Sequence, residues 1–144
     1  MVEFNSDDLA IFSNFERITR VMPTDYLSTE TSVIFLVPPP MLGKSIGPKG
    51  VNIEKLKALF RKRVIVIADS DSLEVFVRNF FGNITIQDIE IRDVMGESNV
   101  IMTVEEKDRG IAIGRDGDRI KAAKSLLKKK FKATIHVRTR RNEI

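Results

Sequence analysis

The sequence predicts an α/β (α+β) fold of two tandem units, each with the element order α-β-β-α-α-β and a three-stranded sheet backed by helices. Three observations predict it. The motif Ile-Gly-Pro-Lys-Gly at 46–50 returns 67 residues later as Ile-Gly-Arg-Asp-Gly at 113–117, and the flanking apolar positions coincide at the same offset. β-branched runs and helical stripes follow one another in the same order in both halves. The hydrophobic fraction, 42%, is typical of globular proteins. We place the units at residues 1–69 and 70–144.

The first unit is predicted to begin with a helix that Ser6 caps, because serine accepts a hydrogen bond from the first helical turn. Pro23 is expected to end this helix. Its apolar stripe is predicted to consist of Ile11, Phe15, Ile18 and Met22. Two strands, a short helix, a long helix and a third strand are expected at 25–29, 31–37, 41–46, 51–63 and 64–68.

The second unit repeats this order. Asp71 and Glu74 form a candidate capping box for a helix over 72–81, and Gly82 suits its C-terminal end. The apolar phase of the next strand slips between Ile86 and Ile89, which predicts a bulge. A strand, a short helix, a long helix and a last strand are expected at 99–104, 110–113, 118–130 and 133–138. We expect the stretch after the long helix to be two residues longer than in the first unit.

The junction between the units is short. Only a few polar residues around Asp69 and Ser70 separate a predicted strand from a predicted helix. Neighbouring domains with such short connections usually pack together rather than swing freely. We therefore expect the two units to form one stiff body.

The charges are sorted along the chain. Residues 1–31 carry six acids against two arginines, and residues 107–141 carry thirteen lysines and arginines against three aspartates. A basic half of this kind favours a polyanion such as nucleic acid as the partner. The chain has no cysteine, no apolar run long enough for a membrane span and no signal-like N-terminus. We expect a cytoplasmic protein without disulfides and without a membrane partner.

The paired glycines of the two motifs are candidates for ligand contact. Gly47 and Gly50, like Gly114 and Gly117, lie three residues apart at the start of a predicted helix. Glycine lets a backbone approach another polymer closely. The N–H groups and the dipole at a helix N-terminus attract anions, and we expect the N–H groups of these loops to be unpaired. A cap and a tight turn would explain one such loop, but two loops in register favour a function.

The side chains around the glycines add charge and an apolar surface. Lys49 supplies a cation to the first loop and Arg115 to the second. Asp116 opposes phosphate binding, and we expect Arg115 and Arg119 to offset it. Isoleucines on both sides of each loop can form a floor on which bases lie.

These motifs resemble the KH-domain family in its prokaryotic, type II topology, in which a Gly-x-x-Gly loop stands between two helices. The run Gly-Ile-Ala-Ile-Gly-Arg-Asp-Gly at 110–117 is especially similar to the second KH domain of the NusA family of transcription elongation and termination factors. A chain of two KH domains looks like the archaeal form of that family. KH loops clamp the backbone of about four single-stranded nucleotides.

The resemblance implies a non-catalytic RNA-binding factor of transcription elongation and termination. Its partners would be single-stranded RNA in the nascent transcript and, as a second candidate, RNA polymerase, with the protein acting as a monomer. The polymerase-binding and OB-type domains of bacterial NusA are not represented in these residues, so RNA binding is implied more directly. The candidate RNA-binding residues are Lys44, Ile46, Gly47, Pro48, Lys49, Gly50, Ile53, Ile113, Gly114, Arg115, Asp116, Gly117, Arg119, Ile120, Lys121 and Lys124.

Other functions remain open at this level. A KH protein of ribosome maturation or RNA degradation is the nearest alternative, followed by a structural module that binds protein through its strands. A helix-turn-helix protein is disfavoured, because only about five residues precede each loop. His136 is the only histidine and lies on a predicted strand, and no Ser/His/Asp arrangement is available beyond it, so we expect no enzyme, no metal site and no cofactor. The acids Glu105, Glu106 and Asp108 are interpreted as a strand end and a helix cap.

Overall fold

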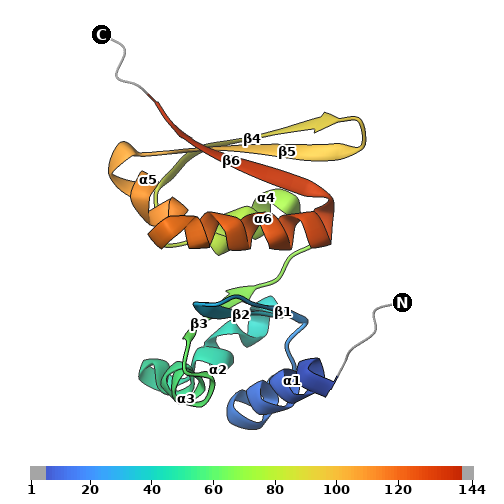
Figure 1. The fold of residues 1–144 in the computed structure, drawn as a ribbon, viewed down its shortest axis with the longest axis vertical. Helices are drawn as coiled ribbons and strands as arrows, with labels where there is room; N and C mark the ends of the chain where they lie inside the picture. Colours follow the sequence, from blue (N-terminus) through green and yellow to red (C-terminus); the bar gives the residue numbers. More distant parts are fainter. Residues whose placement is uncertain (1–5, 141–144) are drawn as a thin grey trace. The chain divides into compact units, whose positions relative to one another are not determined.

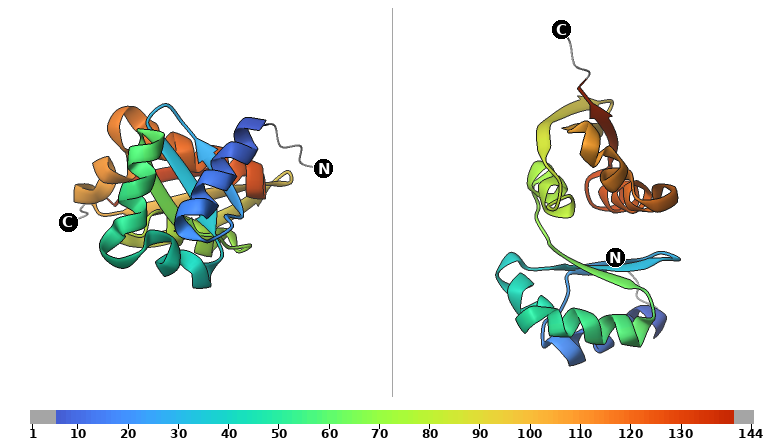
Figure 2. Two further views of the ribbon diagram at one scale, coloured as in Figure 1. Left: turned by 90° about the horizontal axis from the view of Figure 1, so that it is seen from below. Right: turned by 90° about the vertical axis from the view of Figure 1, so that its left-hand side faces the viewer.

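The computed structural model describes residues 6–140. The chain divides into two compact units, Met1–Ser70 and Asp71–Ile144, each built around its own three-stranded sheet (Figure 1). In each unit the helices lie on one face of its sheet, as the right-hand view of Figure 2 shows. Among residues 6–140, no helix is both long and apolar enough to cross a membrane.

In the first unit the sheet has the order β1-β2-β3, with β1 antiparallel to β2 and β2 parallel to β3. All six residues of β2 are buried. The elements are α1 (Ser6–Thr19), β1 (Asp25–Ser28), β2 (Ser32–Val37), η1 (Pro39–Met41), α2 (Leu42–Ile46), η2 (Pro48–Gly50), α3 (Val51–Phe60) and β3 (Arg63–Ala68).

The second unit has the same topology, β4-β5-β6, with β4 antiparallel to β5 and β5 parallel to β6. The elements are α4 (Leu73–Phe80), β4 (Ile86–Val94), β5 (Glu97–Val104), α5 (Glu106–Ile113), η3 (Arg115–Gly117), α6 (Asp118–Phe131) and β6 (Ala133–Thr139). The predicted order α-β-β-α-α-β, with a three-stranded sheet backed by helices, is therefore confirmed. The predicted bulge is also present, as a shift of register between Ile86 and Asp88.

The core of the first unit forms between α1, α3 and the sheet. Phe15 of α1 is fully buried, and its ring centroid lies 4.2 Å from that of Phe35 on β2. The predicted stripe was wrong at Met22, whose side chain is 59% exposed. The reason is local: α1 ends at Thr19 and the next residue turns the chain with φ of +62°, so Val21 is buried instead.

A polar contact also fixes α1 to the sheet. The Tyr26 hydroxyl on β1 donates a hydrogen bond to the Asp8 carboxylate, and its ring meets Phe12 edge-on at 5.4 Å. Burial first, and then this carboxylate, raise the pKa of Tyr26 to about 12. The phenol therefore remains a hydrogen-bond donor throughout the neutral range.

The long helices of the two units differ in length. α3 has 10 residues and ends before its expected end at 63, because Arg61 takes the left-handed conformation, whereas α6 has 14 residues. Val33 pairs with Val64, and its repeat equivalent Val100 pairs with Ile135. The offset between the repeats thus grows from 67 to 71 residues, so the predicted difference of two residues was wrong. The four extra residues extend the helix by about one turn.

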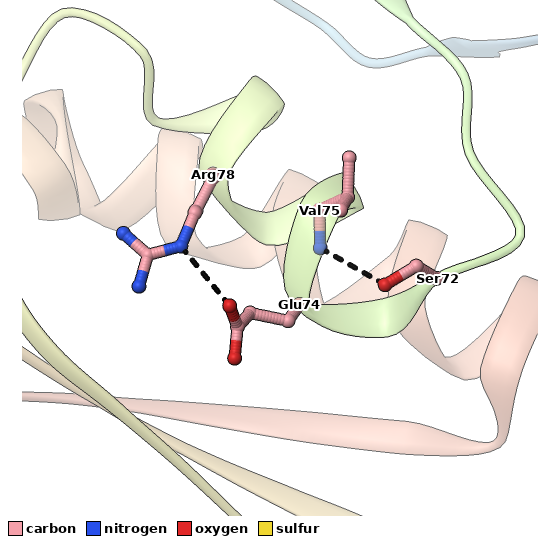
Figure 3. A network of polar contacts seen from close by, with 4 residues as sticks. All are labelled: Ser72, Glu74, Val75 and Arg78. Carbon is pink, nitrogen blue, oxygen red and sulfur yellow. Dashed lines mark hydrogen bonds and ion pairs between the residues drawn. The ribbon is translucent and has the colours of Figure 1, made fainter.

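The start of α4 is capped by Ser72, not by the predicted box of Asp71 and Glu74 (Figure 3). The Ser72 Oγ accepts a hydrogen bond from the Val75 backbone N–H at 3.3 Å. Glu74 lies one position too early for a capping box and instead pairs with Arg78, one turn further on, at 3.4 Å (Figure 3). Gly82 follows the C-cap residue Phe81, so this helix does end where expected.

Candidate nucleic-acid interface

The two glycine loops have the same backbone conformation. The first glycine has φ/ψ of 80°/166° at Gly47 and 82°/174° at Gly114. The residue before the second glycine has 55°/25° at Lys49 and 55°/24° at Asp116. The second glycine has 73°/21° at Gly50 and 75°/16° at Gly117. The duplication seen in the sequence therefore extends to the geometry of the loop.

The first glycine of each loop is required by conformation and by packing. The combination of positive φ with ψ near 180° is essentially restricted to glycine. A Cβ on Gly47 would lie 2.9 Å from the Cγ of Asn52, and a Cβ on Gly114 would lie 2.8 Å from the backbone nitrogen of Arg119. The first glycine thus lets the loop pack against the first turn of the following helix.

The second glycine of each loop is packed less tightly than the first, and only Gly50 faces open space. Within residues 6–140, no side chain beyond those of its two chain neighbours lies closer than 4 Å to where a Cβ of Gly50 would be. At Gly117 the nearest atom is the Cε of Lys121, at 3.7 Å. The two units therefore differ at this position, since only the Cβ direction of Gly50 is clear of neighbouring side chains.

The expectation of unpaired glycine N–H groups was wrong. Gly50 N–H donates to the Gly47 carbonyl at 3.0 Å, and Gly117 N–H donates to the Gly114 carbonyl at 3.2 Å. The first glycines donate in the same way to the carbonyls four residues earlier, at 3.0 and 2.9 Å. These bonds close the turn, so the N–H groups of the four glycines are already used within the loop.

A side chain at the same repeat position braces each loop from behind. Asn52 Nδ2 donates to the carbonyl of Lys44 at 3.0 Å, and Arg119 Nη1 donates to the carbonyl of Ile111 at 3.2 Å. Both donors lie in the first turn of the helix after the loop, and both acceptors lie in the helix before it. The sequence analysis gave no role to Asn52, although its alignment with Arg119 was visible.

Arg119 makes further contacts within the second unit. Its Nη2 donates to the carbonyl of Phe80 at 3.2 Å and to the side-chain oxygen of Asn83. Its guanidinium carbon lies 5.1 Å from the centre of the Phe81 ring. The sequence analysis grouped this arginine with the RNA-binding side chains and with the charges that offset Asp116, whereas the structure directs it toward the end of α4.

The remaining candidate residues are exposed or partly exposed. Pro48, Lys49, Arg115 and Asp116 are exposed between the glycines. Lys44, Lys121 and Lys124 are exposed on the flanking helices. The four isoleucines, Ile46, Ile53, Ile113 and Ile120, are partly buried. Each unit thus places exposed cations and partly exposed isoleucines around its glycine loop.

The helix before the second loop is longer than expected. α5 has eight residues and begins at Glu106, so the statement that about five residues precede each loop holds for α2 and was wrong for α5. Glu105 is the N-cap position, and Asp108 Oδ2 accepts a hydrogen bond from the Thr85 N–H at 3.1 Å.

Within the part of the chain that the structure describes, no group of three or more His, Asp or Glu side chains is arranged to hold a metal.

Gly47 and Gly50 should differ in how well they tolerate a side chain, and the stability of the folded protein tests this difference. Gly50→Asn should lower the free energy of unfolding by less than about 1 kcal/mol, because asparagine tolerates the left-handed conformation. Gly47→Asn should cost at least about 2 kcal/mol, because backbone strain adds to overlap with Asn52. Urea denaturation of the two variants, which introduce the same side chain, measures both. Equal losses would show that the loop does not distinguish its glycines in this way.

The comparisons with known proteins agree with this geometry. A family model described as the KH domain matches residues 71–143, just over half of the chain. The chain is 31% identical over 117 residues to a protein of Halococcus morrhuae named "Probable transcription termination protein NusA", covering 81% of this chain and 84% of that protein. A protein of Methanococcus vannielii with the same name is 27% identical over 122 residues, which is 85% of this chain and 70% of that protein. The crystal structure of APE1850 superimposes with a TM-score of 0.79 at 32% identity and covers 95% of this chain and 100% of that one. The chain therefore belongs to the KH-domain family and, within it, to the archaeal NusA-like proteins.

Proposed function

We propose that this protein binds single-stranded RNA, without catalysing a reaction, as a factor of transcription elongation and termination. The observation that carries the proposal is the repetition of one Gly-x-x-Gly turn with one backbone geometry and an exposed pair of residues between the glycines in each unit. The relatives that bear the name of a transcription termination protein support the cellular process. The RNA would be the nascent transcript, and RNA polymerase would be the second partner. The protein would act as a monomer in the cytoplasm.

The proposed contact uses the loop for the sugar-phosphate backbone. A phosphate that approaches Gly50 meets the start of α3, where the helix dipole is positive, and has the exposed Lys49 within the same turn. In the second unit the equivalent positions are Gly117, the start of α6 and Arg115. Charge-assisted hydrogen bonds from such cations to phosphate are stronger than those between neutral groups.

The apolar side chains explain a preference for unpaired bases. Ile46 and Ile53 stand on the helices that flank the first loop, and Ile113 and Ile120 stand on those that flank the second. All four keep part of their surface exposed, so a base can lie against them. In a duplex the bases are stacked inside and cannot reach this surface. We therefore assign the flanking isoleucines to the bases and the loops to the backbone.

The proposal predicts tighter binding to single-stranded RNA than to a blunt RNA duplex of the same sequence. The affinity for the single strand should fall with salt, with a slope of about 0.7 in log–log form for each phosphate neutralised. Fluorescence anisotropy with labelled oligonucleotides at several salt concentrations gives both quantities. Equal affinity for the two forms would contradict the proposal, because the duplex offers the same phosphates without accessible bases.

The charges of the loops predict unequal contributions. Lys49 gives the first loop a positive charge, whereas Asp116 cancels the charge of Arg115 beside it. Lys49→Ala should therefore weaken RNA binding by about five- to tenfold at moderate salt, and Arg115→Ala should weaken it less.

The two variants each remove one positive charge from an exposed position, so they are matched controls for each other. Binding isotherms with one single-stranded RNA under identical salt compare them directly. A greater loss in Arg115→Ala would make the second loop the stronger phosphate contact and would reverse the ranking.

A further inference from the structure

We propose that Arg119 is a positioning residue, which holds the second glycine loop in its binding conformation instead of contacting phosphate itself. The proposal rests on the proposed function only in that the loop is the RNA contact. The support that Arg119 gives to the loop is inferred from contacts within the second unit. The effect of these contacts on the loop can be measured without RNA.

One guanidinium joins three segments of the second unit. It extends from the first turn of α6, donates to the Ile111 carbonyl in α5 at 3.2 Å, and donates to the Phe80 carbonyl at the end of α4 at 3.2 Å. The side-chain oxygen of Asn83 accepts a further hydrogen bond from the same Nη2 atom. The planar fork of arginine suits such a set of acceptors better than a flexible lysine would.

The ring of Phe81 completes the site. It is fully buried, and the guanidinium carbon lies 5.1 Å from its centre. This is the range in which a cation and an aromatic face attract each other. Both hydrogens of Nη2 are directed to protein acceptors, so the face of the guanidinium that would grip a phosphate in a two-bond arrangement is occupied.

The first unit shows which part of this arrangement belongs to the loop itself. Asn52, at the equivalent position, donates to the Lys44 carbonyl at 3.0 Å, as Arg119 does to Ile111. A bond from the start of the second helix to the end of the first is therefore common to both loops. In the second unit the longer arginine side chain continues past this bond to the end of α4.

The segment after α4, residues 81–85, also makes a hydrogen bond to α5. The Thr85 N–H donates to Asp108 Oδ2 at 3.1 Å, and the Ile84 N–H donates to the Phe81 carbonyl at 3.2 Å. Residues 81–85 are thus fixed to α5 through Asp108 and to α6 through Arg119. This segment is therefore joined by hydrogen bonds to both helices that carry the loop.

Asn83→Ala separates the two roles that Arg119 can have. The asparagine is exposed and uncharged, so its replacement should leave the fold and every charge intact. If Arg119 positions the loop, Asn83→Ala should weaken RNA binding by about two- to tenfold without changing the salt slope. Arg119→Ala should weaken binding more, again with the slope unchanged. Lys121→Ala, which removes an exposed cation from the same helix, should lower the slope by about 0.7 if Lys121 contacts a phosphate.

Hydrogen exchange in the RNA-free protein tests the bracing independently of binding. The Gly114 and Gly117 N–H groups close the loop, and both should exchange faster in Asn83→Ala than in the wild-type chain. Wild-type exchange in Asn83→Ala, together with a salt slope lowered by about 0.7 in Arg119→Ala, would overturn the proposal and make Arg119 a phosphate ligand. Faster exchange in a protein that binds no RNA would instead refute the proposed function and leave the bracing intact.

Discussion

The structure depends on a reversal of the chain that only glycine permits at the first position of each loop. Gly47 and Gly114 combine φ near +80° with an N–H that still completes the helix before the loop. Because no Cβ intervenes, the next helix begins directly against this residue. The two residues between the glycines are consequently turned toward solvent. They are Pro48 and Lys49 in the first loop and Arg115 and Asp116 in the second. The exposed arrangement of the loop follows from this one conformational constraint.

The two units share this frame and differ in the side chains placed on it. The third loop residue is Lys49 in one unit and Asp116 in the other, at nearly identical φ and ψ. The brace behind the loop is a short amide in one unit and an arginine in the other. The second long helix is also one turn longer, which adds lysines at its C-terminal end. The two loops therefore share one backbone conformation and differ in the charges that they expose.

The sequence predicted what local patterns determine and missed what the tertiary fold decides. Element order, the bulge near Ile86 and the loop positions follow from periodicity, β-branched runs and glycine spacing, all of which are local. Met22 was misplaced because a left-handed turn at Arg20 breaks a stripe that periodicity continues. The partners of Arg119 at Phe80 and Asn83 lie 39 and 36 residues away, so no local pattern indicates them. The capping error arose because Asp71 and Ser72 are both good caps and only the backbone distinguishes them.

The central claim is that both glycine loops contact the same class of ligand. A ¹H–¹⁵N titration of the full chain with a short single-stranded RNA tests it most directly, because each loop amide reports on its own surroundings. The account predicts that the largest shifts fall on Lys49 and Gly50 in the first unit and on Asp116 and Gly117 in the second. Shifts confined to the exposed strand residues around His136, with both loops unchanged, would contradict it.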